Sequence, residues 1–269
     1  MLIVAGIASA LIVAVVAMGV MGFIKFDGFA PTNQTNNQNT NQTINGTIPQ
    51  PPTNQTTNGT VTPPPPPSIE LTILGKSGYI DGHGIPTIVG YIKNTGNINL
   101  KNVLLNGSFL CSEGNLINGD TDHPATILGY SELNILAPGE TAPFKLVLPP
   151  DFVNLTYVVD NVKKYQVTVV SYETTSDTPN RSFVFSQTNG VKNAAGFYEL
   201  TGIVKNTGNV TADNVSVIGV FTKTGQLLTA AHAYVGTLLP GQETSFLITV
   251  ADSLVSRSIS NYRLQVEAQ

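Results

Sequence analysis

Apolar and polar positions follow three successive patterns along the 269 residues of the chain. Residues 2–24 form an apolar run without any charged side chain. At about 1.5 Å per residue, a helix of this length crosses a hydrocarbon core of roughly 30 Å. The run therefore predicts an N-terminal transmembrane anchor at residues 1–25, which contacts membrane lipid through residues 2–24. A cleaved signal peptide, which usually begins with basic residues, and a processed, pilin-like assembly helix are the alternatives.

The second pattern, at residues 26–67, is rich in Asn, Thr and Pro. Residues 31–62 carry no charge and almost no large apolar side chain, so burial cannot offset the entropy cost of ordering them. We expect a disordered stalk, and its five final prolines favour polyproline II. The stalk holds five Asn-x-Ser/Thr patterns, which are candidates for N-glycosylation: Asn33, Asn41, Asn45, Asn54 and Asn58. Such glycans lie outside the cytoplasm, so we expect the following domains to be extracellular, although Lys25 alone weakly favours the opposite orientation.

The third pattern begins at residue 68 and consists of short segments in which polarity alternates. Ile88, Gly90 and Ile92 alternate with their neighbours. A period of two predicts strands with one buried face, and short strands between Gly, Asn and Pro turns are typical of a β-sandwich. No segment after the anchor has a convincing helical period. The fold class is therefore expected to be all-β.

Two sequence motifs of this region each occur twice. "GYIKNTGNINLKNV" at residues 90–103 matches "GIVKNTGNVTADNV" at residues 202–215 in eight of fourteen positions. "LAPGETAPFKLVL" at residues 136–148 matches "LLPGQETSFLITV" at residues 238–250 in the same order. The repeat predicts two homologous β-sandwich domains, at residues 68–172 and 181–269.

The repeated motifs supply residues that suit turns. Glycine can adopt a positive φ, proline presets φ, and asparagine side chains satisfy backbone groups in turns. We therefore assign eight residues to structural turns: Asn94, Gly96, Pro138, Gly139, Asn206, Gly208, Pro240 and Gly241. We expect Gly96 and Gly208 to supply the positive φ.

The order of these motifs resembles the FxLYD-type and CARDB-like β-sandwich domains. The resemblance rests on "G-x-V-K-N-T-G-N", then "N-V-x-V", then "L-x-P-G-x" before an aromatic-led strand, and on the hairpin-like stretch "VFTKTGQLL" at residues 220–228. The terminal motif of the family is not preserved, since "YRLQVEA" stands near its place. The resemblance implies immunoglobulin-like sandwiches of archaeal or bacterial envelope proteins, used for structure, adhesion or presentation, and it brings no catalytic site. With the Asn/Thr-rich stalk, we favour an archaeal surface protein.

Composition narrows the classes of partner. The net charge is −4 and charged residues are 11% of the chain, so no basic surface suggests nucleic acid. The single cysteine, Cys111, cannot form an intrachain disulfide. The two predicted domains hold five further glycosylation patterns: Asn106, Asn154, Asn180, Asn209 and Asn214.

One loop could bind a metal. The first domain has about ten extra residues before Pro138, and there Asn118, Asp120 and Asp122 alternate as oxygen donors do in calcium loops. His123 stands where such a loop needs Gly, and Gly129 where it needs Glu, so we favour a solvated loop without metal.

Other candidate chemistry is sparse. "DGHG" at residues 81–84 is interpreted as a turn, and His232 as a structural histidine on a strand. No serine lies in a nucleophile-elbow pattern, and the sequence shows no phosphate-binding loop or zinc spacing, so we expect neither an enzyme nor a cofactor.

The favoured hypothesis is a non-catalytic, single-pass membrane protein with two extracellular sandwiches. It would serve envelope architecture, adhesion or binding of a protein or glycan partner, and self-association is a further option. The alternatives are a subunit of a pilus-like filament, and a solute- or metal-binding accessory protein of the cell surface.

Overall fold

A computed structural model of the chain describes residues 66–118, 124–149 and 155–268. The predicted membrane helix and nearly all of the predicted stalk lie outside the described residues. So do five stalk asparagines and three residues of the later loops: Asn33, Asn41, Asn45, Asn54, Asn58, Asp120, Asp122 and Asn154. No helix within the described ranges is long and apolar enough to cross a membrane.

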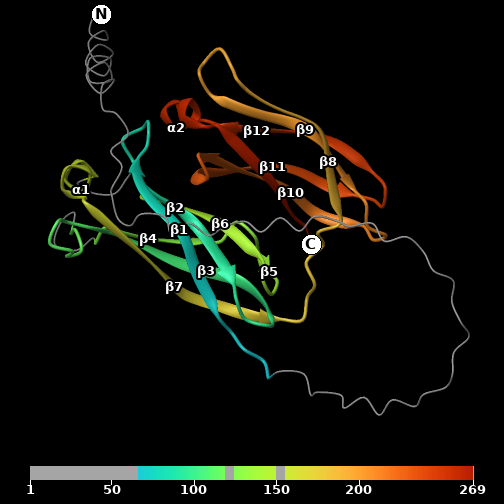
Figure 1. Cartoon of the computed structure of the whole chain (residues 1–269), viewed down its shortest axis with the longest axis horizontal. Coiled ribbons are helices and arrows are strands. Elements are labelled where there is room, and N and C mark those ends of the chain that lie inside the picture. The colour runs from blue at the N-terminus through green and yellow to red at the C-terminus, as the bar shows by residue number, and fades with distance from the viewer. Residues whose placement is uncertain (1–65, 119–123, 150–154, 269) are drawn as a thin grey trace, which may run out of the picture.

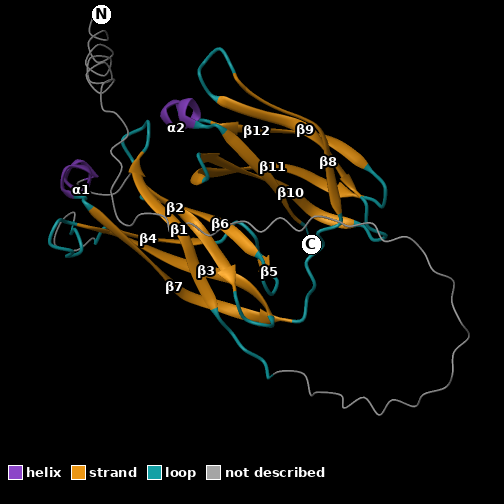
Figure 2. Cartoon of the chain, in the orientation of Figure 1, coloured by secondary structure: helices purple, strands orange, loops and turns teal. Residues whose placement is uncertain are grey.

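The described chain is all-β, with antiparallel sheets and two short helices (Figure 2). We call β1 to β7 the first half and β8 to β13 the second half. The strands of the first half are β1 (Leu71–Ile80), β2 (Pro86–Asn94), β3 (Asn99–Leu110), β4 (Thr126–Tyr130), β5 (Ile135–Leu136), β6 (Thr141–Val147) and β7 (Lys164–Thr175). The strands of the second half are β8 (Phe183–Lys192), β9 (Tyr198–Asn206), β10 (Ala212–Lys223), β11 (Gln226–Leu238), β12 (Glu243–Val250) and β13 (Asn261–Glu267).

The two halves pair their strands by the same scheme. In the first half β2 lies between β1 and β6, and β3 pairs with β7 and with both β4 and β5. In the second half β9 lies between β8 and β12, and β10 lies between β11 and β13. The repeated sequence is therefore matched by a repeated order of antiparallel strands.

Each half packs apolar side chains between two facing sheets. A Cβ added at Gly107 on β3 would come within 2.9 Å of Leu146 and 3.1 Å of Ile88, which lie in the facing sheet. In the second half, a Cβ at Gly219 on β10 would meet Ile248 of β12 at 3.2 Å. Glycine at these positions lets the facing sheets approach closely.

The two halves also pack against each other. β11 lies against β1, β2 and β6 of the first half, so the sheets are stacked in four layers (Figure 1). β2 shows the consequence, because Thr87 and Val89 are as fully buried as Ile88. The alternating pattern predicts one buried face for this strand, and that prediction is wrong because the second half covers the other face.

Two helices stand where the sequence predicts none, so that prediction is wrong too. α1 spans Leu155–Asn161 and α2 spans Ser253–Ser258, and each lies just before the last strand of its half. Helices of seven and six residues are too short to show a clear apolar period. Asp252 caps α2, since its Oδ1 accepts from the backbone N–H groups of Leu254 at 2.8 Å and Val255 at 3.0 Å.

Candidate functional site

The repeated Asn-Thr-Gly turn is held by a buried asparagine in each half. The amide nitrogen of Asn94 donates to the carbonyls of Ile98 at 2.8 Å and Leu136 at 2.9 Å, and its Oδ1 accepts from Gly96 N–H at 3.0 Å. Asn94 is fully buried. Its side chain therefore ties the turn after β2 to the strand before the Pro-Gly turn.

Glycine at positions 96 and 208 has a different role from the one the sequence suggests. Neither Gly96 nor Gly208 has a positive φ, whereas Gly139 and Gly241 have φ of +78° and +76°. The prediction for Gly96 and Gly208 is therefore wrong. A Cβ at Gly96 would lie 2.4 Å from the carbonyl oxygen of Ser68, so the residue is small because the segment before β1 passes directly over it.

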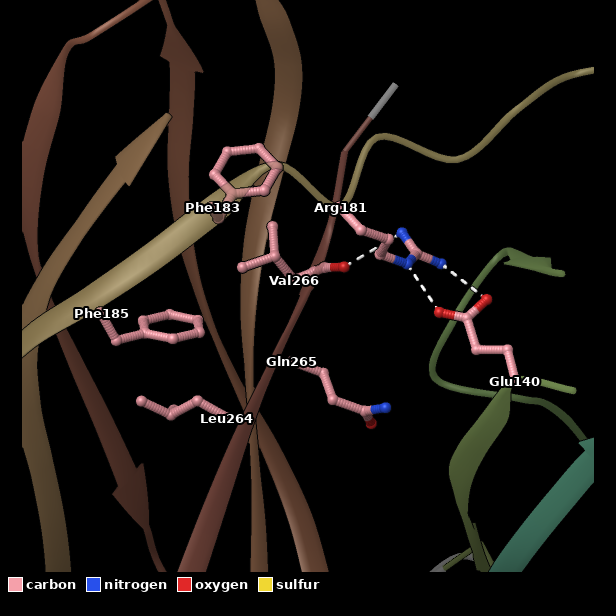
Figure 3. A pocket seen from close by; sticks show the side chains of 7 residues that line it. All are labelled: Glu140, Arg181, Phe183, Phe185, Leu264, Gln265 and Val266. Carbon is pink, nitrogen blue, oxygen red and sulfur yellow. Dashed lines mark hydrogen bonds and ion pairs between the residues drawn. The ribbon is translucent and has the colours of Figure 1, made fainter. Parts of the chain in front are cut away.

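Arg181, in the joint between the halves, is the centre of the contact between them. Its Nε donates to Glu140 Oε1 at 2.7 Å and its Nη2 donates to the carbonyl of Ile135 at 2.8 Å, both in the first half. Its Nη1 donates to the carbonyl of Val266 at 3.1 Å on β13. Figure 3 shows the guanidinium reaching from the joint to the carboxylate of Glu140. One side chain thus binds both halves.

Glu267 at the end of β13 is the most perturbed acid of this contact. Its Oε2 lies 3.4 Å from Arg181 Nη1 and accepts from the backbone N–H of Asn134 at 3.2 Å. Burial raises the pKa of the Glu267 carboxyl to about 7, against the opposing attraction of Arg181. Its Oε1 is buried and has no hydrogen-bond partner among the described residues.

Two small clefts lie along β13. One, of about 220 Å³, has apolar Phe183, Phe185 and Leu264 on one side and polar Glu140 and Arg181 on the other (Figure 3). The second, of about 250 Å³, is lined by Tyr130, Ser131, Glu132, Leu133, Asn134 and Glu267, together with Asn102 and Val103. Both are smaller than the pockets that hold drug-sized ligands. Their charged side chains take part in the contacts that join the two halves, which suits docking of the halves better than binding of a large ligand.

His232 lies on β11, where the sequence predicts a strand, and it contacts the first half. Its Nε2 lies 2.5 Å from Glu132 Oε2. Arg263 of β13 also reaches across, with its guanidinium carbon 5.7 Å from the centre of the Tyr91 ring. The contact between the halves is thus lined with polar pairs as well as apolar side chains.

Among the described residues, Asp81, His83 and Asp252 form a group of side chains with potential metal-ligand atoms close together. Their ligand atoms lie within 4.8 Å of one another. Asp81 Oδ1 accepts from the N–H groups of His83 and Ile85, each at 2.9 Å, which makes "DGHG" a turn. Asp252 caps α2 with Oδ1, and its Oδ2 accepts from Gly82 N–H at 3.0 Å. Turn formation and capping therefore account for this arrangement without a metal.

The residues of the predicted metal loop and of the predicted glycosylation sites differ in their exposure to solvent. Asn118 is exposed, and its predicted companions Asp120 and Asp122 lie outside the described residues. Asn209 and Asn214 are exposed, and Asn106 is half-buried on β3. The amide nitrogen of Asn180 is buried beside Arg181 without a hydrogen-bond partner in the described chain.

The outer face of the first half carries exposed apolar side chains. Leu128 and Tyr130 on β4 are 56% and 60% exposed, and Val170 on β7 is 52% exposed. Leu128 pairs with Asn106 in the strand register. Exposed apolar side chains grouped on one face are typical of surfaces that contact a partner.

Sequence reasoning missed the residues that join the halves. In the sequence, Glu140 is only the residue after a Pro-Gly pair, and Arg181 is only the first residue of the second predicted domain. A signal did exist, because charged residues are only 11% of this chain. A lone Arg at the first position of the second predicted domain is then a candidate to pair with an acid of the first domain.

Comparison with known proteins gives no assignment: no protein-family model and no curated protein matches the chain.

Proposed function

We propose that this chain is a non-catalytic surface protein that holds two immunoglobulin-like β-sandwich domains outside the cell on a membrane-anchored, glycosylated stalk. The support for two such domains is the strand order, in which β1-β2-β6 and β8-β9-β12 repeat one scheme. The support for the anchor and stalk is the sequence of residues 2–67. The FxLYD-type and CARDB-like resemblance belongs to the same proposal.

The observation that carries the proposal is the contact centred on Arg181. Hydrogen bonds from one guanidinium to Glu140, Ile135 and Val266 fix the two halves to each other. Domains joined only by a flexible linker do not share partly buried charged contacts of this kind. A block of fixed shape suits presentation of a surface at the end of a spacer.

The partner is proposed to be a protein or a glycan of the cell surface. The face around Leu128 and Tyr130 is the candidate contact surface, and strand edges such as β4 and β8 offer backbone groups for pairing. A glycan on Asn106 would stand on the same face and would limit access to it.

Fractionation of native cells tests the anchor. The protein should stay in the membrane pellet after a high-salt wash and enter the supernatant with detergent. A matched variant that lacks residues 2–24 should be soluble without detergent. Release of the full chain by salt alone would overturn the anchored protein.

Immunogold microscopy with an antibody against residues 181–269 separates the remaining alternatives. Gold scattered along the cell boundary supports the displayed protein. Gold strung along fibres would favour the filament subunit, in which the N-terminal helix or exchanged strands link copies. An accessory protein for solutes or metals would instead show a rise in melting temperature with its solute or ion.

A further inference from the structure

One face of β13 is built to meet the first half. Arg263, Gln265 and Glu267 are two residues apart, so their side chains share a face of the strand. Arg263 lies over the Tyr91 ring, Gln265 Nε2 donates to the carbonyl of Thr141 at 3.0 Å, and Glu267 Oε2 accepts from Asn134 N–H at 3.2 Å. These three contacts can therefore exist only while the two halves are docked.

The charges around Glu267 do not balance when its carboxyl is ionised. Arg181 is already bound to Glu140 through Nε at 2.7 Å and Nη2 at 3.4 Å, so Glu267 has only a 3.4 Å contact with Nη1. Glu132 lines the same cleft as Glu267 and pairs with His232 of β11. Beyond this group, exposed Glu173 accepts from Asn102, which also lines the cleft. A buried carboxylate that shares its cation with a second carboxylate is costly.

Two buried oxygen atoms here lack donors. Glu267 Oε1 and Gln265 Oε1 have no hydrogen-bond partner among the described residues, and both belong to the face of β13 just described. Buried acceptors without donors are rare and cost free energy. A proton on Glu267 Oε1 would remove the charge and create a donor on the face of β13 that also carries the unpaired amide oxygen of Gln265.

We propose that Glu267 is a proton-controlled latch between the two halves: the protonated carboxyl holds them docked, and loss of the proton weakens the docking. The docked arrangement would therefore be favoured on mildly acidic surfaces and loosened in alkaline surroundings. The latch would act on the shape of the presented block and does not depend on which partner the block binds.

The direction of the pH effect follows from linkage. The pKa of Glu267 is raised from 4.5 to about 7 in the docked form, and an exposed carboxyl in an opened form would have its ordinary pKa. Docking therefore takes up a proton between these values. It is strongest below pH 4.5, weakens as pH rises to about 7, and then stays constant.

Hydrogen exchange of the full chain in detergent can measure the docking of the two halves at one backbone amide. The N–H of Asn134 donates to Glu267 Oε2, so its protection requires docking. After correction for the intrinsic exchange rate, we expect its protection factor to fall on the order of 100-fold between pH 4.5 and pH 8. Protection of the β9 amides inside the second half should not change over this range.

Variants separate Glu267 from other titrating groups. E267Q keeps the acceptor for Asn134 and gains an amide donor, so protection should be high and independent of pH. E140Q frees Arg181 for Glu267, so the fall should move to lower pH. E243Q removes an exposed carboxylate that pairs with Lys205, and it should keep the wild-type response.

Three results would overturn the latch. The first is a protection factor of the Asn134 amide that stays constant over the pH range in the wild-type chain. This result can be interpreted without any variant. E267Q could keep the wild-type response. Finally, His232→Gln could abolish the response, which would assign the titration to the pair of His232 with Glu132.

Discussion

Asn94 and Asn206 make the same three side-chain hydrogen bonds, although 112 residues separate them. The amide nitrogen of Asn206 donates to the carbonyls of Val210 and Leu238, each at 2.9 Å, and its Oδ1 accepts from Gly208 N–H at 2.9 Å. Both side chains are fully buried. The repeated motif therefore encodes one buried asparagine in each half, whose side chain joins two turns by hydrogen bonds. We call Asn94 and Asn206 the asparagine pins.

Replacing the pin should destabilise the half that contains it. Asn206→Ala leaves two carbonyls and one N–H without their partner, at a cost of about 3 kcal/mol in the free energy of unfolding. Urea unfolding measures the loss. Asn209→Ala, in the same turn but exposed, is the matched control and should change stability by less than about 0.5 kcal/mol. Equal effects of the two substitutions would contradict the role of the pin.

Gly→Ala substitutions at Gly96 and Gly139 of the first half should lower the free energy of unfolding by different amounts. Gly96→Ala would place Cβ 2.4 Å from a backbone oxygen, so the segment before β1 must move, and we expect a loss of about 2 kcal/mol or more. Gly139→Ala meets no atom within 4 Å and suffers only from its φ of +78°, for a loss of about 1 kcal/mol. Thermal unfolding of both variants tests the order, and a larger loss at Gly139 would refute the close-approach explanation.

Local patterns were sufficient to predict much of the fold. The alternation at Ile88, Gly90 and Ile92 gave a strand because side-chain direction on a strand has a period of two. The second buried face of the same strand was not predictable, because the covering residues come from β11, more than 130 residues later. Long-range packing, unlike periodicity, leaves no local pattern.

The pairing of Arg181 with Glu140 was not predictable from the sequence for the same reason. Glu140 and Arg181 each look like ordinary polar residues of a turn and a joint. Their pairing depends on how the four sheets stack, which no single motif specifies. The two asparagines were easier to find, because the motif "KNTGN" occurs twice and its residue types already suggested a structural role in turns.

Arg181 should not be replaceable by lysine. The guanidinium donates in three directions, to Glu140, Ile135 and Val266, and one ammonium group cannot reproduce that fork. Arg181→Lys should therefore lower the protection of the Asn134 amide from hydrogen exchange by at least tenfold at pH 5. Lys101→Arg alters a half-buried cation whose ion-pair contacts are 3.9 Å long and lie within the first half and the joint, and it serves as the control. Wild-type protection in Arg181→Lys would mean that the apolar contacts alone hold the halves.

Glycosylation should distinguish sites that are equivalent in sequence. A glycan is joined to the amide nitrogen of asparagine, and at Asn180 this atom is buried in the folded chain. We expect Asn209 and Asn214, which are exposed, to carry glycans in native cells, and Asn180 to be unmodified. Mass spectrometry of proteolytic peptides gives the occupancy of each site. Arg181→Ala removes the side chain packed beside Asn180 and should raise occupancy there, while leaving Asn209 unchanged. Full occupancy of Asn180 in the wild-type chain would show that this segment is modified before the halves dock.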